Sequence, residues 1–253
     1  FMKKKIELTM TLCLLAAAFI LARQGAILVQ TTAASKESSS ESTEFSEASS
    51  EASQKDSGQI CIVVDAGHGG SDPGKVGIND ALEKDINLAL ALKLKALLEE
   101  DNIKVVLTRD SDAGLYSESS TNKKVEDMQK RCQIITDANP VFTVSLHQNS
   151  YPTADIKGAQ VFYYGQSAKG KELAELIQKK LIAEVDPENH RAAKANESYY
   201  LLKKTPTPTV IVECGFLSNE EEAALLLTDD YQNQLVYAIH LGILEYLQAE
   251  NLL

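Results

Sequence analysis

Hydrophobic residues along this chain follow two periods, and the alternation between them predicts the secondary structure. Short runs rich in β-branched and other apolar residues, bounded by Gly, Pro or polar residues, are typical of buried strands. Such runs occupy residues 59–65, 103–108, 141–146, 159–164, 199–202 and 209–212. Apolar residues that recur every three to four positions predict amphipathic helices. This period is found in residues 83–100, 122–139, 167–184 and 230–249.

Strands that alternate with helices predict an α/β fold. We expect a single three-layer domain, in which a mostly parallel twisted sheet carries helices on both faces. One further helix is expected from Ser218 through Leu227, because Ser218 and Glu221 form a Ser-x-x-Glu capping box. The chain contains no internal repeat.

Three of the predicted strands end on residues suited to metal chemistry. The first strand leads into the Gly-rich segment that contains His68, and the strands at 141–146 and 209–212 lead directly into His147 and Glu213. In open parallel sheets the functional crevice lies outside the carboxyl ends of the strands. We therefore expect these three side chains to converge at one crevice. A phosphate-binding loop is a poor alternative, because the Gly-rich segment has neither a G-x-G-x-x-G pattern nor a P-loop lysine.

Glu83 begins the first predicted helix, fifteen residues after His68. A first-turn acid favoured by the helix dipole is one interpretation of this residue. The start of this helix, however, faces the same edge of the sheet as His68. Two histidines and one carboxylate form a three-ligand zinc set that leaves a position open for water. His68, Glu83 and His147 are thus candidate Zn²⁺ ligands, and Glu213 is a candidate general base.

The first fifth of the chain differs in composition from the rest. Three lysines at residues 3–5 precede an uncharged, mostly apolar run at residues 8–22, which has the form of an export signal and is short for a membrane-spanning helix. We assign residues 1–34 to an export signal, cleaved at a small-x-small site ending at Ala34, or to a retained N-terminal membrane anchor. Residues 35–58 contain ten serines and six acidic residues, a composition that predicts a disordered linker. The catalytic domain is then residues 59–253.

The charge of the chain restricts its partners. Of the formal net charge of −11, residues 59–253 carry −10 and contain no basic cluster. An acidic domain of this kind argues against nucleic acid as a partner. The export signal predicts a protein that acts outside the membrane.

Four segments together carry a resemblance to a known family. They are VVDAGHGGSDPG at 63–74, LEKDINLALALKLKALL at 82–98, VSLHQNS at 144–150 and IVECGFLSN at 211–219. In order and spacing they resemble the zinc-dependent N-acetylmuramoyl-L-alanine amidases of the Amidase_3 family, over residues 60–247. The resemblance implies zinc ligands at His68, Glu83 and His147, and a catalytic role for Glu213.

The resemblance also implies a reaction and a substrate. The substrate is peptidoglycan, and the bond cleaved is the amide between the lactyl group of N-acetylmuramic acid and the L-alanine of the stem peptide. Substrate contacts are implied at Asn149 and at Arg191, which lies where relatives often carry an arginine. Together with the export signal, this substrate implies a location in the cell wall or on the outer face of the membrane. Whether an accessory protein takes part is left open.

The single catalytic domain and residues 198–219 most resemble the germination-specific branch of the family, which modifies spore-cortex peptidoglycan. This similarity implies a role in sporulation or germination. Two alternatives are a zinc peptidase that cuts within wall peptides and a catalytically inactive homologue that binds the wall. The inactive alternative is disfavoured because all four ligand and catalytic positions are intact.

Overall fold

Six strands form one sheet in the order β2-β1-β3-β6-β4-β5 in the computed structural model, which describes residues 59–253. The strands are β1 (Cys61–Ala66), β2 (Lys104–Leu107), β3 (Phe142–Asn149), β4 (Gln160–Tyr163), β5 (Lys194–Ala195) and β6 (Thr209–Phe216). All neighbouring strands are parallel except β4 and β6, which are antiparallel. The predicted α/β class with a mostly parallel sheet is confirmed. The predicted export signal and linker, residues 1–34 and 35–58, lie outside the described residues.

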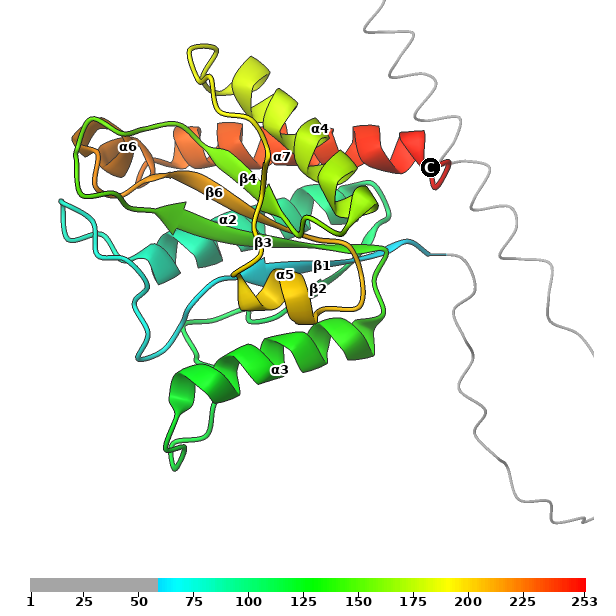
Figure 1. Ribbon diagram of the computed structural model, residues 1–253, viewed down its shortest axis with the longest axis horizontal. Coiled ribbons are helices and arrows are strands. Elements are labelled where there is room, and N and C mark those ends of the chain that lie inside the picture. Colours follow the sequence, from blue (N-terminus) through cyan, green and yellow to red (C-terminus); the bar gives the residue numbers. More distant parts are fainter. Residues whose placement is uncertain (1–58) are drawn as a thin grey trace, which may run out of the picture. The chain divides into compact units, whose positions relative to one another are not determined.

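Helices cover both faces of the sheet, as predicted. They are α2 (Glu83–Glu100), α3 (Lys123–Ala138), α4 (Ala168–Glu184), α5 (Tyr200–Lys204), α6 (Glu220–Leu225) and α7 (Asp229–Ala249). Figure 1 shows α3 and α5 on one side of the sheet and α4 and α7 on the other. None of the helices within residues 59–253 combines the length and the apolar character needed to cross a membrane.

The strands place alternate residues on opposite faces, because successive side chains of a strand point in opposite directions. In β1, Ile62 and Val64 belong to the large hydrophobic core that also includes residues of α2, α4 and α7. Val63, between them, packs with Ile135 of α3 and Leu201 of α5 in a much smaller cluster. One face of the sheet therefore carries the main hydrophobic core, and the other face has few apolar contacts and also buries polar side chains.

Residues 199–202 form no strand, which corrects the prediction for this segment. They lead into the short helix α5, which begins after the side chain of Asn196 accepts hydrogen bonds from the backbone N–H groups of Ser198 and Tyr199. Leu201 and Leu202 both pack onto the sheet, in two different hydrophobic clusters. Adjacent strand residues would point to opposite faces, so one helical turn is what lets both leucines be buried against the same layer.

The helix predicted from Ser218 begins one residue later than expected. The side chain of Asn219, not of Ser218, accepts a hydrogen bond from the backbone N–H of Glu222 at the start of α6. The Glu222 carboxylate accepts from the N–H groups of Gly158 and Phe216 instead of closing a capping box. Asn219 is a strong N-cap residue in its own right, and Glu222 connects α6 to the loops at the end of β6.

Candidate metal centre and active site

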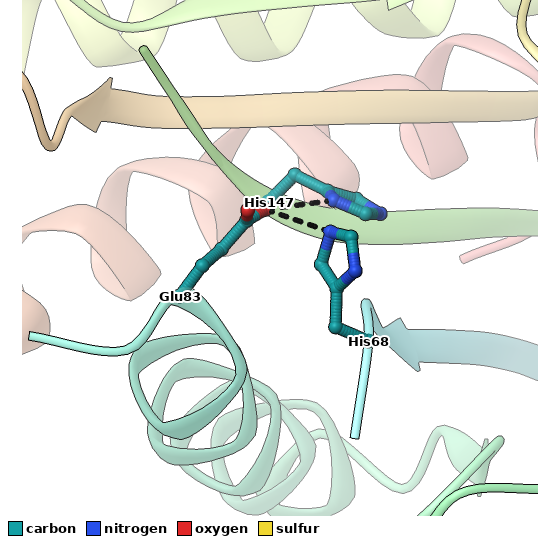
Figure 2. Close-up of side chains that lie close together, drawn as sticks. All are labelled: His68, Glu83 and His147. Carbon is teal, nitrogen blue, oxygen red and sulfur yellow. Dashed lines mark hydrogen bonds and ion pairs between the residues drawn. The ribbon is translucent and has the colours of Figure 1, made fainter. Parts of the chain in front are cut away.

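Three of the predicted site residues lie together at the carboxyl end of the sheet. His68 follows β1, Glu83 is in the first turn of α2, and His147 is near the end of β3. Their potential ligand atoms all lie within 4.8 Å of one another. Glu83 Oε1 is 3.3 Å from His68 Nε2 and 2.9 Å from His147 Nδ1. Figure 2 shows the three side chains pointing toward one another from these separate elements.

Two glycines allow the three segments to approach so closely. A Cβ at Gly67 would lie 2.3 Å from the His147 ring, and a Cβ at Gly74 would lie 2.6 Å from the Glu83 carboxylate. Both distances are far below a van der Waals contact. His68 itself has a φ of +62°, in the left-handed region that residues other than glycine rarely adopt. The Gly-rich segment is therefore shaped by the packing of the site.

The Glu83 carboxylate is buried and held from several directions. Its Oε2 accepts a hydrogen bond from the N–H of Lys75 at 2.7 Å, and Oε1 accepts one from the N–H of Gln148 at 3.0 Å. Burial by itself would raise the pKa of Glu83, but hydrogen bonds and charge from His147 and His68 outweigh burial and hold this pKa far below its usual value. The carboxylate is therefore ionised and attracts a positive charge to the cluster.

Asp72 orients the His68 ring. His68 Nδ1 lies 2.8 Å from Asp72 Oδ2, and Asp72 Oδ1 accepts from the N–H of Gly74. Burial tends to lower the pKa of His68, yet the hydrogen bonds and charges of Glu83 and Asp72 raise it overall. A proton donated from Nδ1 to Asp72 leaves Nε2 free to face the cluster, which is the usual support of a ligating histidine. Asp72 was not recognised from the sequence, although an acidic residue four positions after a candidate ligand in the same loop is a usable indication.

Glu213 lies on β6 directly beside His147, its register partner on β3. The residue is only 7% exposed, and its Oε2 has no hydrogen-bond partner among the described residues. Burial, with the charge of Glu83, raises the pKa of Glu213, while His147 opposes this effect. A buried carboxylate oxygen without a hydrogen-bond partner is unusual in a folded protein, and a raised pKa suits a group that both accepts and donates protons near neutral pH.

A cavity of about 140 Å³ adjoins these residues. Its wall includes His68, His147 and Glu213 on the sheet side, and residues of α3 and of the α5 segment opposite them. Tyr199 also lines it, and burial followed by the charge and hydrogen bonding of Glu213 raises the pKa of Tyr199 to about 12. Tyr199 was not recognised from the sequence, because the segment was expected to be a strand.

Asn149 and Arg191, the expected substrate contacts, are engaged elsewhere and do not line this cavity. Asn149 Oδ1 accepts from the N–H of Ser150. Arg191 donates from Nε to the carbonyl of Lys157 and lies over the ring of Phe216, 4.8 Å from the ring centroid. Their role in substrate binding stays a prediction.

The fold and the site together define the class of protein. A sheet that gathers two histidines and two buried carboxyl groups around a cavity at the carboxyl ends of its strands has the form of a hydrolase site. Residues 62–245 match the family model Amidase_3, described as N-acetylmuramoyl-L-alanine amidase. The chain belongs to this family, and the resemblance found in the sequence is confirmed.

Individual relatives agree with the family assignment. The germination-specific N-acetylmuramoyl-L-alanine amidase of Bacillus subtilis (strain 168) is 37% identical over 193 residues, which is 75% of this chain and 80% of the relative. The CwlD amidase of Clostridioides difficile, solved in complex with the GerS lipoprotein, is 42% identical with a TM-score of 0.74, covering 76% of this chain and 100% of that one. The amidase AmiC2 of Nostoc punctiforme is 34% identical with a TM-score of 0.67, covering 76% and 98%.

Proposed function

We propose that this chain is an exported, zinc-dependent N-acetylmuramoyl-L-alanine amidase that acts on spore-cortex peptidoglycan. It cleaves the amide between the lactyl group of N-acetylmuramic acid and the L-alanine of the stem peptide. The observation that carries the proposal is the convergence of His68, Glu83 and His147 next to the buried carboxylate of Glu213, whose Oε2 has no hydrogen-bond partner among the described residues.

The residues of the cluster fit a zinc ion. Two imidazole nitrogens and one carboxylate oxygen are a usual donor set of catalytic zinc sites, which keep one position for water or substrate. The support of His68 by Asp72 is also usual at such sites. The ionised Glu83 and the hydrogen bonds around it favour a cation where its Oε1 faces His68 and His147.

The chemistry is divided between the ion and Glu213. When bound, zinc lowers the pKa of water from about 15.7 toward about 7 and polarises the carbonyl of the amide. Glu213 accepts a proton from the attacking water and delivers it to the nitrogen of L-alanine as the carbon–nitrogen bond breaks. The products are the lactyl carboxylate of the sugar and a stem peptide with a free amino group. Tyr199, beside Glu213, is placed to keep this carboxyl group oriented toward the cavity.

The cortex role and the partner are supported by the relatives. A germination-specific amidase and the CwlD amidase are each similar over three quarters of this chain. Because the latter was solved with a lipoprotein, we propose that this chain also works with an accessory lipoprotein. Residues 1–34 would direct export, and a random-coil linker of 24 residues spans roughly 25–30 Å. A retained anchor would then limit the enzyme to peptidoglycan close to the membrane.

Mass spectrometry of purified peptidoglycan tests the reaction. Digestion by the full chain with added Zn²⁺ should release stem peptides that begin with a free L-alanine and leave sugar strands without peptides. Cuts between amino acids would identify the zinc peptidase instead, and no release from any peptidoglycan would identify the inactive homologue. The rates of release from cortex and from vegetative peptidoglycan show which of the two is the preferred substrate. The N-terminal mass of the protein from fractionated cells shows whether residues 1–34 are retained as an anchor.

A further inference from the structure

A group of buried charges lies directly behind the candidate metal centre. Arg131 of α3 is 2% exposed and Arg109, after β2, is 4% exposed. Asp65, at the end of β1, and Asp127 of α3 accompany them and are also buried. Charged residues are almost never buried to this extent unless they are paired. The proposed reaction assigns no role to Arg109 or Arg131.

Arg131 is bonded both to the acids and to the loop that carries His68. Its Nη1 and Nε donate to Asp65 and Asp127, both at 2.6 Å. Nη1 also donates to the carbonyl of Ala66 at 2.7 Å and to the hydroxyl of Thr108 at 3.5 Å, and Nη2 donates to the carbonyl of His68 at 2.5 Å. The side chain thus holds the carbonyl groups of the two residues that flank Gly67.

Arg109 connects the same loop to the start of α2. Its Nε donates to the carbonyl of Ala66 at 2.9 Å. Its Nη2 is shared between the carbonyls of Gly67, at 3.0 Å, and Lys84, at 2.8 Å. Since Lys84 follows Glu83, one guanidinium fixes the distance between the segments that carry His68 and Glu83.

Asp65 extends the network to the third segment. Its Oδ2 accepts a hydrogen bond from the hydroxyl of Ser145 at 2.5 Å. Ser145 precedes His147 by two residues on β3 and so shares its face of the strand. The network therefore forms hydrogen bonds in each of the three segments that carry a candidate ligand: with the carbonyl of His68, with the carbonyl of Lys84 beside Glu83, and with the hydroxyl of Ser145 two residues before His147.

The conformation of His68 explains why such support is needed. Its positive φ is unfavourable for a residue with a side chain, and such a conformation persists only where the surroundings determine it. Hydrogen bonds from a guanidinium to a carbonyl are charge-assisted and among the strongest available to a protein. The planar guanidinium presents five N–H donors in a fixed arrangement, whereas a lysine ammonium is a point charge with three donors.

We propose that Arg131 and Arg109 are positioning residues of the metal centre, which fix the His68 loop and its distance from Glu83 before the ion binds. The inference rests on the proposed zinc site. Support of this kind around ligands typically contributes 10- to 100-fold in metal affinity. A merely structural role would lower stability without a specific effect on metal binding.

The test compares Arg131→Lys with Thr108→Val in the full chain. Thr108 donates to Asp65 at 2.6 Å, accepts a hydrogen bond from Arg131 at 3.5 Å and is buried in the same network, but it bonds to no carbonyl of the His68 loop. Zinc affinity is measured by competition with a chelator, and stability by urea unfolding of the zinc-free protein. We expect Arg131→Lys to bind zinc about 10- to 100-fold more weakly and Thr108→Val to bind it as the wild type does.

A second measurement needs no metal. The N–H groups of Gly67 and Gly69 are hydrogen-bonded to the carbonyls of Leu146 and Asp72, so their hydrogen exchange reports the order of the loop. In zinc-free protein these amides should exchange faster in Arg131→Lys than in Thr108→Val. If Arg131→Lys does not unfold cooperatively, Arg109→Lys replaces it in both measurements, with the same expected results.

The outcomes separate this inference from the proposed function. Wild-type zinc affinity and loop protection in a folded arginine variant would overturn the positioning role. Equal losses in Thr108→Val would also overturn it, since they would show a general effect of the network on stability. A wild-type protein that binds no zinc would refute the proposed metal site, and the exchange measurement alone would then decide whether the arginines order the loop.

Discussion

The two faces of the sheet contrast in what they bury. The face under α2, α4 and α7 is apolar, and residues such as Val64, Val144 and Val212 merge there into one large core. The same three strands carry Asp65, Ser145 and Glu213 one residue further along, on the face under α3 and α5. These side chains are also almost inaccessible to water.

The difference shows how the fold divides its work. Burial of apolar area on the first face is the main source of stability, whereas buried charges on the second face carry a desolvation cost that their pairing only partly offsets. Each strand can contribute to the apolar core and to the site, because its successive side chains point to opposite faces of the sheet. Substitution of a site residue on the second face should therefore leave the apolar core, and with it the fold, intact.

The largest expected effect comes from His147→Ala. The variant should lose bound zinc and amidase activity to below detection, because it removes a ligand, yet it should keep its fold, because the apolar core lies on the other face. Metal analysis, a peptidoglycan-release assay and circular dichroism measure the three quantities. His190→Ala, at an exposed histidine, is the matched control. Full zinc occupancy in His147→Ala would disprove the ligand assignment.

Glu213→Gln should separate catalysis from metal binding on the second face. The amide keeps the size of the side chain but cannot accept a proton, so the rate should fall about 10²- to 10⁴-fold while zinc stays bound. The rate of peptide release and the metal content are measured on the same sample. If zinc were lost with activity, Glu213 would be a ligand, and Glu83 would be left as an acid at a helix start.

The sequence predicted elements best where local chemistry determines them. The helix expected at 122–139 is α3, capped at its start by the side chain of Asn122 and ended by Asn139 in a left-handed conformation. Residues 199–202, by contrast, have the apolar and aromatic composition of a strand. Their helical turn allows Leu201 and Leu202 both to pack against the sheet, and the local sequence pattern does not contain these contacts.

The site shows the same limit. The strand-end pattern was enough to predict that His68, His147 and Glu213 come together, because the topology of parallel strands determines where those ends meet. Glu83 was added because the helix that it begins starts at the same edge of the sheet. Arg109 and Arg131 gave no such indication, since an arginine after a strand or within a helix is usually exposed. Their burial depends on Asp65 and on the loop carbonyls, and only the tertiary structure brings these together.

Leu94→Ala tests the apolar face. Leu94 is fully buried in the large core, and removal of its side chain should lower the free energy of unfolding by about 2–5 kcal/mol. Zinc affinity and the rate per folded molecule should not change, because Leu94 lies in the core eleven residues along α2 from Glu83, away from the site at the carboxyl ends of the strands. Urea unfolding measures the loss, and Leu92→Ala, on the exposed side of the same helix, should change stability by less than about 0.5 kcal/mol. A loss of zinc affinity in Leu94→Ala would break the division between the faces.

Acid should weaken the second face through Asp65. Burial tends to raise the pKa of this carboxyl, but the charge of Arg131 and the hydrogen bonds from Ser145 and Thr108 outweigh it and lower the pKa from 3.8 to about 2. The ionised carboxylate therefore stabilises the fold above pH of about 4, and this contribution, roughly 2–3 kcal/mol, is lost as the pH falls from about 4 to about 2. Unfolding free energies of wild type and Asp65→Asn, measured by urea at several acid pH values, should converge across that window, with Asp155→Asn at an exposed carboxylate as the control. A difference between wild type and Asp65→Asn that stays constant with pH would show that the acid stabilises this face by packing and not by its charge.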